Sequence, residues 1–579
     1  MNWADYLVMF LSLLAIALAG IFSTRSKQSV HQYLRSGNEM DWLSIGLGVM
    51  ATQASAITFL SAPGLGYESG LRFVQFYFGM PIAIVIISRY FIPIYYKLNV
   101  YTAYEYLEQR FDLRIRLLTA FLFLVQRGLA AGLTIYAPAI ILSTILNWNL
   151  NLTILAVGGL VIIYTVSGGS KAVSVTQKWQ MAIILLGMMV ALVVVLVKLF
   201  EHINLNEALM LAGRAGRMQA IDTGFSYKER YTLWSGLTGG LFLALSYFGT
   251  DQSQVQRYLG GKSVKASRFG LIFNGLLKIP MQFVILAIGV FIYVFYLFQT
   301  PPMNFNQAGI RALEQSEYKD EWEGLKKEFK RNHETIQHQR QNFVEAVRRT
   351  DPLAKQKASS AMEAAESKET VLRGEVRALI LKAAPDQNAK DTNYVFLHFV
   401  LNYLPHGLIG LLLAVILSAA MSSTSGELSA LSSCTLVDFY KRFGGKADEK
   451  HTLFIGKLMT VLWGIAAISF AWAAKLFDNL IEMVNVLGSL FYGTILGVFL
   501  VAFFLKHIGS KAVLWSALVA EAVVLLIHLG RVQKWPFVLK HLDMEYLWYN
   551  VVGCLLLLAL ALLFQTIQNR LMKFKLNET

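Results

Sequence analysis

The sequence predicts an all-α integral membrane protein. Of its 579 residues, 55% are hydrophobic and only 15% are charged. About thirteen apolar runs approach the roughly 20 residues that a helix needs to cross a bilayer. Basic residues gather in alternate connections between these runs, as they do in proteins that hold one orientation in a membrane.

The expected spanning helices are distributed along the whole chain. Each run is apolar over nearly its full length and is bounded by charged residues, glycine or proline, which are typical of loops at a membrane surface. We expect spanning helices at residues 3–22, 42–61, 74–96, 117–145, 150–166, 179–199, 232–256, 269–299, 405–437, 452–474, 480–505, 512–530 and 546–567.

The charge pattern orients these helices. Much of the net charge of +15 lies in connections on one side, among them 97–116, 257–268, 441–450 and 570–575. Because cytoplasmic loops carry such an excess of Lys and Arg, we expect a multi-pass plasma-membrane protein in the lipid bilayer, with its N-terminus outside and its C-terminus cytoplasmic. The charge is then a topology signal, and no nucleic acid is expected as a partner.

Residues 301–392 differ in character from the rest of the chain. They are rich in Lys, Glu, Gln and Ala, with apolar residues such as Phe329, Ile336 and Phe343 at a heptad-like spacing. Prolines bound the segment at both ends. It is either a helical hairpin or a partly disordered insert outside the membrane. It serves either as a solvated insert or as a lid for a partner.

The run 42–61 carries small and hydroxylated residues at its centre, including Ala51, Ala54, Ser55 and Thr58. Unwound or polar segments at membrane depth persist only where they line a cavity inside the protein. Broken helices of this kind build substrate and ion sites in secondary transporters. Close packing of small residues between helices explains the same residues equally well.

A second polar group lies deep in the run 405–437. Ser422 and Ser423 present hydroxyl oxygens there, and Ala419 presents a backbone carbonyl oxygen. Na⁺ is a hard cation that suits about five or six oxygens, and neutral oxygens bind it weakly enough to release it. The group therefore indicates a sodium site, although serine clusters also join helices by hydrogen bonds.

Ionisable residues also lie inside the expected spanning helices. Lys278 lies about ten residues into the run 269–299, where an uncompensated charge costs several kcal/mol, so it is a candidate functional residue. Asp251, in the run 232–256, can neutralise it across a shared cavity. Arg127, in the run 117–145, is expected to form a salt bridge or to extend toward the membrane surface.

Three sequence motifs resemble those of one family. Residues Tyr101 to Phe111 (YTAYEYLEQRF) resemble its cytoplasmic motif before the third core helix. Residues Gly168 to Val173 (GGSKAV) resemble its GGxKAV motif, and Asp251 to Tyr258 (DQSQVQRY) resemble its NQxQVQRY motif. On these motifs the chain is identified as a member of the sodium:solute symporter family, whose members include sodium/glucose, sodium/iodide, monocarboxylate and sialic-acid symporters.

The resemblance implies a LeuT-type core of two inverted five-helix repeats. The runs 42–61, 232–256 and 405–437 become core helices 1, 6 and 8. The implied divisions are 1–41, an extra N-terminal spanning helix and cytoplasmic loop; 42–300, the first repeat and the start of the second; 301–392, the insert; 393–505, the rest of the second repeat; and 506–579, additional C-terminal spanning helices.

The resemblance also implies the site residues. The sodium ligands would be the carbonyl oxygens of Ala51, Ala54 and Ala419 and the hydroxyl groups of Ser422 and Ser423. The substrate would lie at the midplane near Ser55, Thr58, Phe73, Tyr77, Asp251, Lys278 and Asn485. No metal other than Na⁺ is expected. Gln177 and Gly426 stand where some members place an aspartate and a serine, which argues against a second sodium ion.

The substrate class stays open between a sugar and a carboxylate. Lys278 and Asn485 match residues of the sugar-transporting relatives. Ser55 and Thr58 resemble the carboxylate-binding hydroxyls of sialic-acid transporters, but Ala130 stands where those proteins place an arginine. Residues 132–139 resemble the branch that carries monocarboxylates, vitamins and iodide.

The sequence as a whole therefore predicts a transporter and not an enzyme. We expect a sodium-coupled symporter that imports a small polar solute by alternating access, as a monomeric transport unit. A proton-coupled transporter of the same fold is the alternative, motivated by Asp251 and Lys278. A sensor is least favoured, because few residues follow Lys575.

Overall fold

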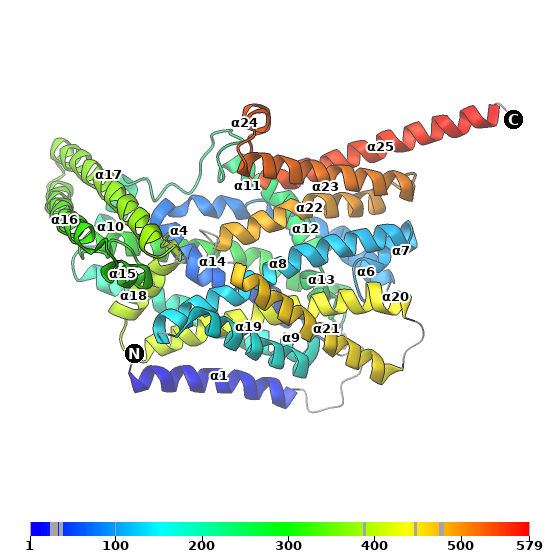
Figure 1. The fold of residues 1–579 in the computed structure, drawn as a ribbon, viewed down its shortest axis with the longest axis horizontal. Helices are drawn as coiled ribbons and strands as arrows, with labels where there is room; N and C mark the ends of the chain where they lie inside the picture. Colours follow the sequence, from blue (N-terminus) through cyan, green and yellow to red (C-terminus); the bar gives the residue numbers. More distant parts are fainter. Residues whose placement is uncertain are drawn as a thin grey trace.

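The computed structural model describes residues 2–23, 33, 39–98, 100–146, 148–385, 389–444, 448–473 and 480–577 and is drawn in Figure 1. Over these residues the regular structure is helical, with one isolated bridge between Met40 and Gly261 and no strand. Ten described segments are long and apolar enough to cross a membrane. The all-α membrane class is confirmed, whereas the expected count of about thirteen spanning helices stays a prediction.

The helices follow the expected runs closely. The first half of the chain forms α1 (Trp3–Ser23), α3 (Trp42–Gln53), α4 (Ala56–Ser69), η2 (Gly70–Tyr77), α5 (Met80–Ile86), η3 (Ile87–Phe91), α6 (Ile92–Leu98), α7 (Glu105–Arg110), α8 (Leu113–Leu146), α9 (Leu150–Phe200), α10 (Leu205–Arg214), α11 (Leu233–Leu237), α12 (Gly239–Gly249), α13 (Gln252–Leu259) and α14 (Val264–Tyr296). The second half forms α15 (Gln307–Glu314), α16 (Lys319–Arg348), α17 (Pro352–Ala383), η4 (Thr392–Tyr394), α18 (Val395–Tyr403), α19 (Leu408–Cys434), η5 (Thr435–Tyr440), α20 (Lys441–Phe443), α21 (Glu449–Ala473), α22 (Leu480–Phe504), α23 (Ser510–Val532), α24 (Pro536–His541) and α25 (Leu547–Asn577).

Two of the expected helices are broken at polar residues. α3 ends at Gln53, the backbone of Ser55 is extended, and α4 begins at Ala56. α12 ends at Gly249, and the Asp251 carboxylate caps α13 by accepting a hydrogen bond from the Ser253 amide at 2.8 Å. The break expected in the run 42–61 is thus confirmed, and the run 232–256 is broken as well.

The two expected runs at 150–166 and 179–199 both lie within α9. The hydroxyl of Tyr164 nevertheless contacts the hydroxyl of Thr176. Twelve residues of straight helix would separate these two positions by about 18 Å. The helix must therefore bend sharply between them, so that the chain turns back as the two separate runs require.

Glycines allow the outer half of the first broken helix to lie close to α14. A Cβ at Gly289 of α14 would lie 1.9 Å from the carbonyl oxygen of Pro63, and one at Gly66 of α4 would lie 2.2 Å from that of Leu286. A methyl group cannot fit at either distance, so glycine is required on both sides. The broken helix is thereby held against the helix that carries Lys278.

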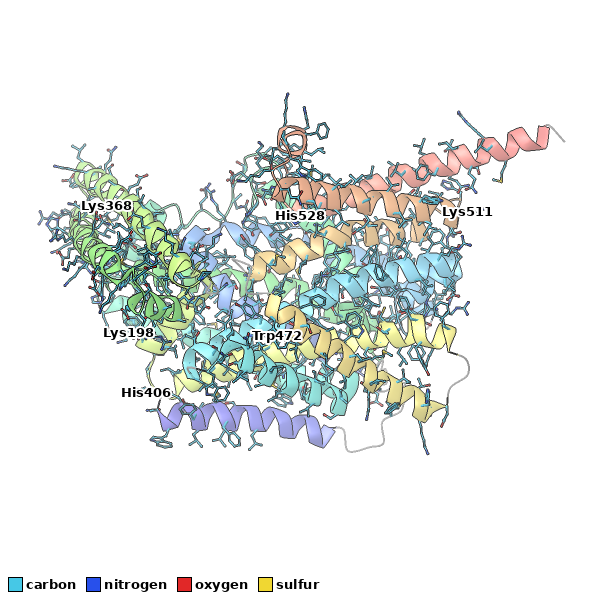
Figure 2. All side chains as sticks on the ribbon, viewed as in Figure 1. Lys198, Lys368, His406, Trp472, Lys511 and His528 are labelled. Atoms are coloured by element: carbon cyan, nitrogen blue, oxygen red, sulfur yellow. The ribbon has the colours of Figure 1, made fainter. Side chains whose placement is uncertain are left out.

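The insert forms a helical hairpin, which is one of the two expected alternatives. α16 and α17 pack along each other beside the short α15, and Phe329, Ile336 and Phe343 are all buried. In Figure 1 the hairpin lies at the end of the molecule where the chain begins, and α25 carries the C-terminus to the opposite end. Lys198 and His406 also lie at this insert end, whereas Lys511 lies at the opposite end (Figure 2).

Candidate functional site

Two of the oxygens expected to bind sodium meet where α3 ends beside α19. The Ser422 hydroxyl donates to the carbonyl oxygen of Ala51 at 3.2 Å, and the Ser423 hydroxyl donates to that of Ala419 at 2.9 Å. All four residues are buried, as is Ala54, whose backbone lies in the helix break. One hydrogen bond thus joins an expected ligand oxygen of α3 to one of α19, and the full set of sodium ligands stays a prediction.

A neutral amide and a guanidinium group lie beside these oxygens. Gln177 Nε2 donates to the Thr52 hydroxyl at 3.1 Å and to the Ser422 carbonyl oxygen at 3.0 Å. A Cβ at Gly426 would lie 2.8 Å from Nη2 of Arg257, so the missing side chain makes room for the buried arginine. Neither Gln177 nor Gly426 adds a charged side-chain ligand for a second cation.

A central cavity of about 110 Å³ adjoins the break between α3 and α4. Of the residues expected to bind substrate, it is lined by Ser55, Thr58, Tyr77, Lys278 and Asn485. They come from α4, η2, α14 and α22, and the break brings the first of them to the cavity wall. By the measure in which one water fills about 10–15 Å³, the cavity holds on the order of ten water-sized positions.

Phe73 does not line this cavity, although it was expected to share a face with Tyr77. An α-helix would place these residues on one face, but they lie in the 3₁₀-helix η2. At three residues per turn, positions four apart point about 120° away from each other. Phe73 is buried and stacks on Phe76, with 5.5 Å between the ring centroids.

Asp251 lies behind the cavity and pairs with Arg127, not with Lys278. Arg127 contacts the Asp251 carboxylate directly, and Tyr492 donates to the same carboxylate at 2.7 Å. The second guanidinium nitrogen of Arg127 donates to Glu427 at 3.1 Å. The expected pairing of Asp251 with Lys278 was therefore wrong, whereas the salt bridge expected for Arg127 is confirmed.

Glu427 is the site residue for which the sequence suggested no role. It is buried on α19, lines the central cavity, and accepts a hydrogen bond from the Thr134 hydroxyl at 2.8 Å. The sequence alone could have singled out Glu427 as a candidate, because a carboxylate inside a spanning helix needs a partner. Arg127 supplies that partner from α8.

Known proteins share the sequence pattern and the fold of this chain. The sodium:solute symporter family profile matches residues 33–317 and 371–520. The chain belongs to the sodium:solute symporter family. The symporter is 27% identical over 529 residues to sodium-coupled monocarboxylate transporter 1 of Mus musculus, a match that covers 91% of this chain and 73% of that protein. It is 31% identical over 299 residues to the sodium/iodide cotransporter of Homo sapiens, covering 50% and 45% of the two chains.

The fold of the symporter matches a solved structure of the same architecture. A Na⁺-coupled sialic acid symporter in a substrate-bound outward-open state superposes with a TM-score of 0.74 and 21% identity, covering 98% of each chain. The LeuT-type fold is thereby confirmed. Proteins of this family are transporters and not enzymes, and the proton-coupled alternative is not favoured.

Lys278 of the symporter is a buried cation at the wall of the central cavity. It is 1% exposed. Among the described residues it forms no ion pair, and its ammonium nitrogen lies 5.4 Å from the centre of the Tyr77 ring. Asn485 Nδ2 and Gln53 Oε1, which line the same cavity, are also buried without a hydrogen-bond partner in the described chain. The cavity thus presents these two donors and one acceptor to a solute, beside the hydroxyl groups of Ser55, Thr58 and Tyr77.

Proposed function

We propose that this symporter imports a small solute with one carboxylate group, coupled to Na⁺, across the plasma membrane. The pairing of Asp251 with Arg127 is the observation that carries the proposal, since it leaves the Lys278 ammonium without a carboxylate partner among the described residues. Burying a charge is costly unless the charge is paired. A carboxylate on the solute supplies the missing partner.

The charge of the site supports the same class of solute. Arg127 and Lys278 contribute two positive charges, and Asp251 and Glu427 contribute two negative ones, so the four ionised groups sum to zero. One Na⁺ adds a positive charge, which one carboxylate neutralises. A sugar would leave the loaded site with a net charge at membrane depth, where charge is costly. The monocarboxylate and sialic acid relatives are consistent with this choice.

The sodium ion is bound by the carbonyl oxygens of Ala51, Ala54 and Ala419 and the hydroxyl oxygens of Ser422 and Ser423. The hydrogen bond from Ser422 to Ala51 already holds two of these oxygens 3.2 Å apart across two helices. When the ion binds, the hydroxyl protons turn away and the oxygen lone pairs face the cation. Sodium therefore links the helix break to α19, next to the substrate.

We assign one Na⁺ to each transport cycle. Gln177 is neutral, and the guanidinium group of Arg257 lies beside Gly426, where a side-chain ligand of a second ion would be needed. One Na⁺ with one monocarboxylate moves no net charge. The sodium gradient then drives uptake, and the membrane potential does not.

The proposed orientation of the chain in the membrane follows the distribution of its basic residues. It places the N-terminus and the insert outside and the C-terminus in the cytoplasm. The termini lie at opposite ends of the molecule (Figure 1). The basic connections 97–116 and 441–450 then face the cytoplasm, as positively charged loops do. The transport unit is a monomer, because one chain supplies every residue of the proposed site.

Uptake into proteoliposomes tests the function. We expect an inward Na⁺ gradient to drive accumulation of radiolabelled lactate, and replacement of Na⁺ by choline to abolish it. A potassium diffusion potential set with valinomycin should leave the rate unchanged. Sodium-driven uptake of glucose without lactate would refute the carboxylate class, and lactate uptake in choline would refute sodium coupling. A rate of lactate uptake that depends on the membrane potential would refute the ratio of one Na⁺ to one carboxylate.

A further inference from the structure

A larger cavity lies beneath the insert, near the C-terminal ends of α4 and α14. It has a volume of about 400 Å³ and is lined by Tyr67 of α4, Tyr293 of α14, His333 of α16, Arg373 of α17 and Arg217. Among the described residues, it shares no lining residue with the central cavity. Residues 318–370, which supply part of its wall, lie outside the family match.

Aromatic rings form one wall of this outer cavity. The Tyr67 ring lies edge-on to Tyr293 and Phe305, with centroid distances of 6.0 Å and 5.6 Å. The guanidinium carbon of Arg217 lies 3.8 Å from the centre of the Tyr293 ring, and that of Arg373 lies 5.4 Å from the centre of the Phe305 ring. The cavity therefore presents flat apolar surfaces next to positive charge.

The acidic residues of the outer cavity are already occupied. Glu366 accepts hydrogen bonds from Arg214 and from the Tyr293 hydroxyl, each at 2.6 Å. Asp391 accepts one from Arg377 at 2.8 Å, and Glu369 accepts one from Arg373 at 3.0 Å. Glu68 accepts one from the Thr392 hydroxyl at 2.5 Å. These carboxylates are thus paired or hydrogen-bonded within the protein, and only the donors that they do not use are left to a ligand.

Several polar groups of the lining are left over. Within the described chain, Arg217 forms no ion pair, and it donates to the backbone carbonyl oxygen of Glu68. Nη2 of Arg373 and Nε2 of His333 are buried without a hydrogen-bond partner there, and His333 is only 2% exposed. Buried polar groups normally have partners. A ligand with acceptor oxygens would provide them.

We infer that the outer cavity is a second binding site, for an organic carboxylate with a flat apolar body. The carboxylate binds to Arg217 and to the free nitrogen of Arg373, and the apolar body packs on Tyr67, Tyr293 and Phe305. Arginine suits this task because its planar donors match a carboxylate and its face stacks on aromatic rings. The choice of a carboxylate as the ligand of the outer cavity rests on the proposed function. Solute of this class would bind here before it enters the central site.

Benzoate binding to purified Lys278→Met protein tests the outer site, because that substitution removes the central carboxylate partner. The titration is made by calorimetry without Na⁺, which the outer cavity does not need. Benzamide serves as the neutral ligand of the same shape. The variants are Arg217→Met, which removes the unpaired cation, and Thr370→Trp, which blocks the cavity from an exposed position on α17. Arg72→Met is the matched control, since Arg72 pairs with Asp222 and does not line the cavity.

We expect benzoate to bind, and benzamide or the Arg217→Met protein to bind about tenfold more weakly or worse, as for a lost charged hydrogen bond. Thr370→Trp should also weaken binding, and Arg72→Met should change it by less than about twofold. Absence of sodium-free benzoate binding, or binding unaffected by both cavity variants, would overturn the site. If lactate uptake fails while this binding persists, the proposed function falls and the outer site remains.

Discussion

Replacing Lys278 with Met should distinguish a carboxylate substrate from a neutral one. Lys278 lies 14 residues from the first residue of α14 and 18 from the last, at Val264 and Tyr296. At 1.5 Å per residue, these distances are about 21 Å and about 27 Å. The side chain is far too short to bring its ammonium group to either end, so the charge acts within the central cavity. Methionine keeps a similar length and removes the charge.

The size of the effect follows from the interaction that is lost. A hydrogen bond to a charged group contributes about 1.5–3 kcal/mol, and about 1.4 kcal/mol corresponds to a factor of ten in affinity. Lactate should therefore bind Lys278→Met about 10- to 150-fold more weakly than the wild type. Lactamide, which has the same shape without the charge, should lose much less. Stability should not fall, because an ammonium group without a partner costs free energy when it is buried.

The assay is competition against labelled lactate in sodium-loaded binding buffer, with both ligands and both proteins. Four dissociation constants form a cycle, from which the coupling between the lysine and the carboxylate is obtained. The melting temperature of each protein without ligand is measured in parallel. Equal losses for lactate and lactamide would refute the ion-pair argument, and an unchanged lactate affinity would exclude Lys278 from the site.

Three further predictions concern sodium, packing and the insert. Ser423→Ala should raise the Na⁺ concentration for half-maximal uptake about tenfold or more, because a ligand oxygen is lost, whereas Ser429→Ala should leave it unchanged; equal values in both would move the ion elsewhere. Gly289→Ala should lower the melting temperature, since its Cβ would lie 1.9 Å from a carbonyl oxygen, whereas Gly159→Ala, with no atom within 4 Å, should not; identical melting curves would contradict this packing. Replacement of residues 301–391 by a Gly/Ser linker should preserve sodium-driven uptake, because long loops cost little entropy to change, and should abolish sodium-free benzoate binding. Normal expression with lost uptake would instead assign the insert a part in transport.

The features that the sequence predicted well are those set by neighbouring residues. The break between α3 and α4 is visible in its small and hydroxylated residues, and the hairpin of α16 and α17 is visible in its apolar spacing. Phe73 shows the limit of this approach. Its expected position depended on helical periodicity, and the chain adopts a 3₁₀-helix there, which changes the face on which each residue lies.

The partners of buried charges were the hardest features to predict. Asp251 and Arg127 are 124 positions apart, and Arg127 and Glu427 are 300 positions apart. Composition and spacing show that such charges need partners, but they do not say which helices meet. From the sequence, Lys278 and Asp251 were an equally reasonable pair; the packing instead brings Arg127 of α8 to both Asp251 and Glu427.

Whether Asp251 pairs with Arg127 or with Lys278 determines whether the lysine has a carboxylate partner before a solute binds. If Lys278 paired with Asp251, the lysine would have a carboxylate partner in the empty site, and the solute would not need to supply one. Because Arg127 binds both Asp251 and Glu427, the helix break at Asp251 is neutralised whether or not substrate is present. The remaining negative charge of this cluster favours a nearby cation, and Lys278 and Na⁺ are the two cations available. With both in place the site carries one positive charge in excess, and an organic carboxylate is the solute that removes it.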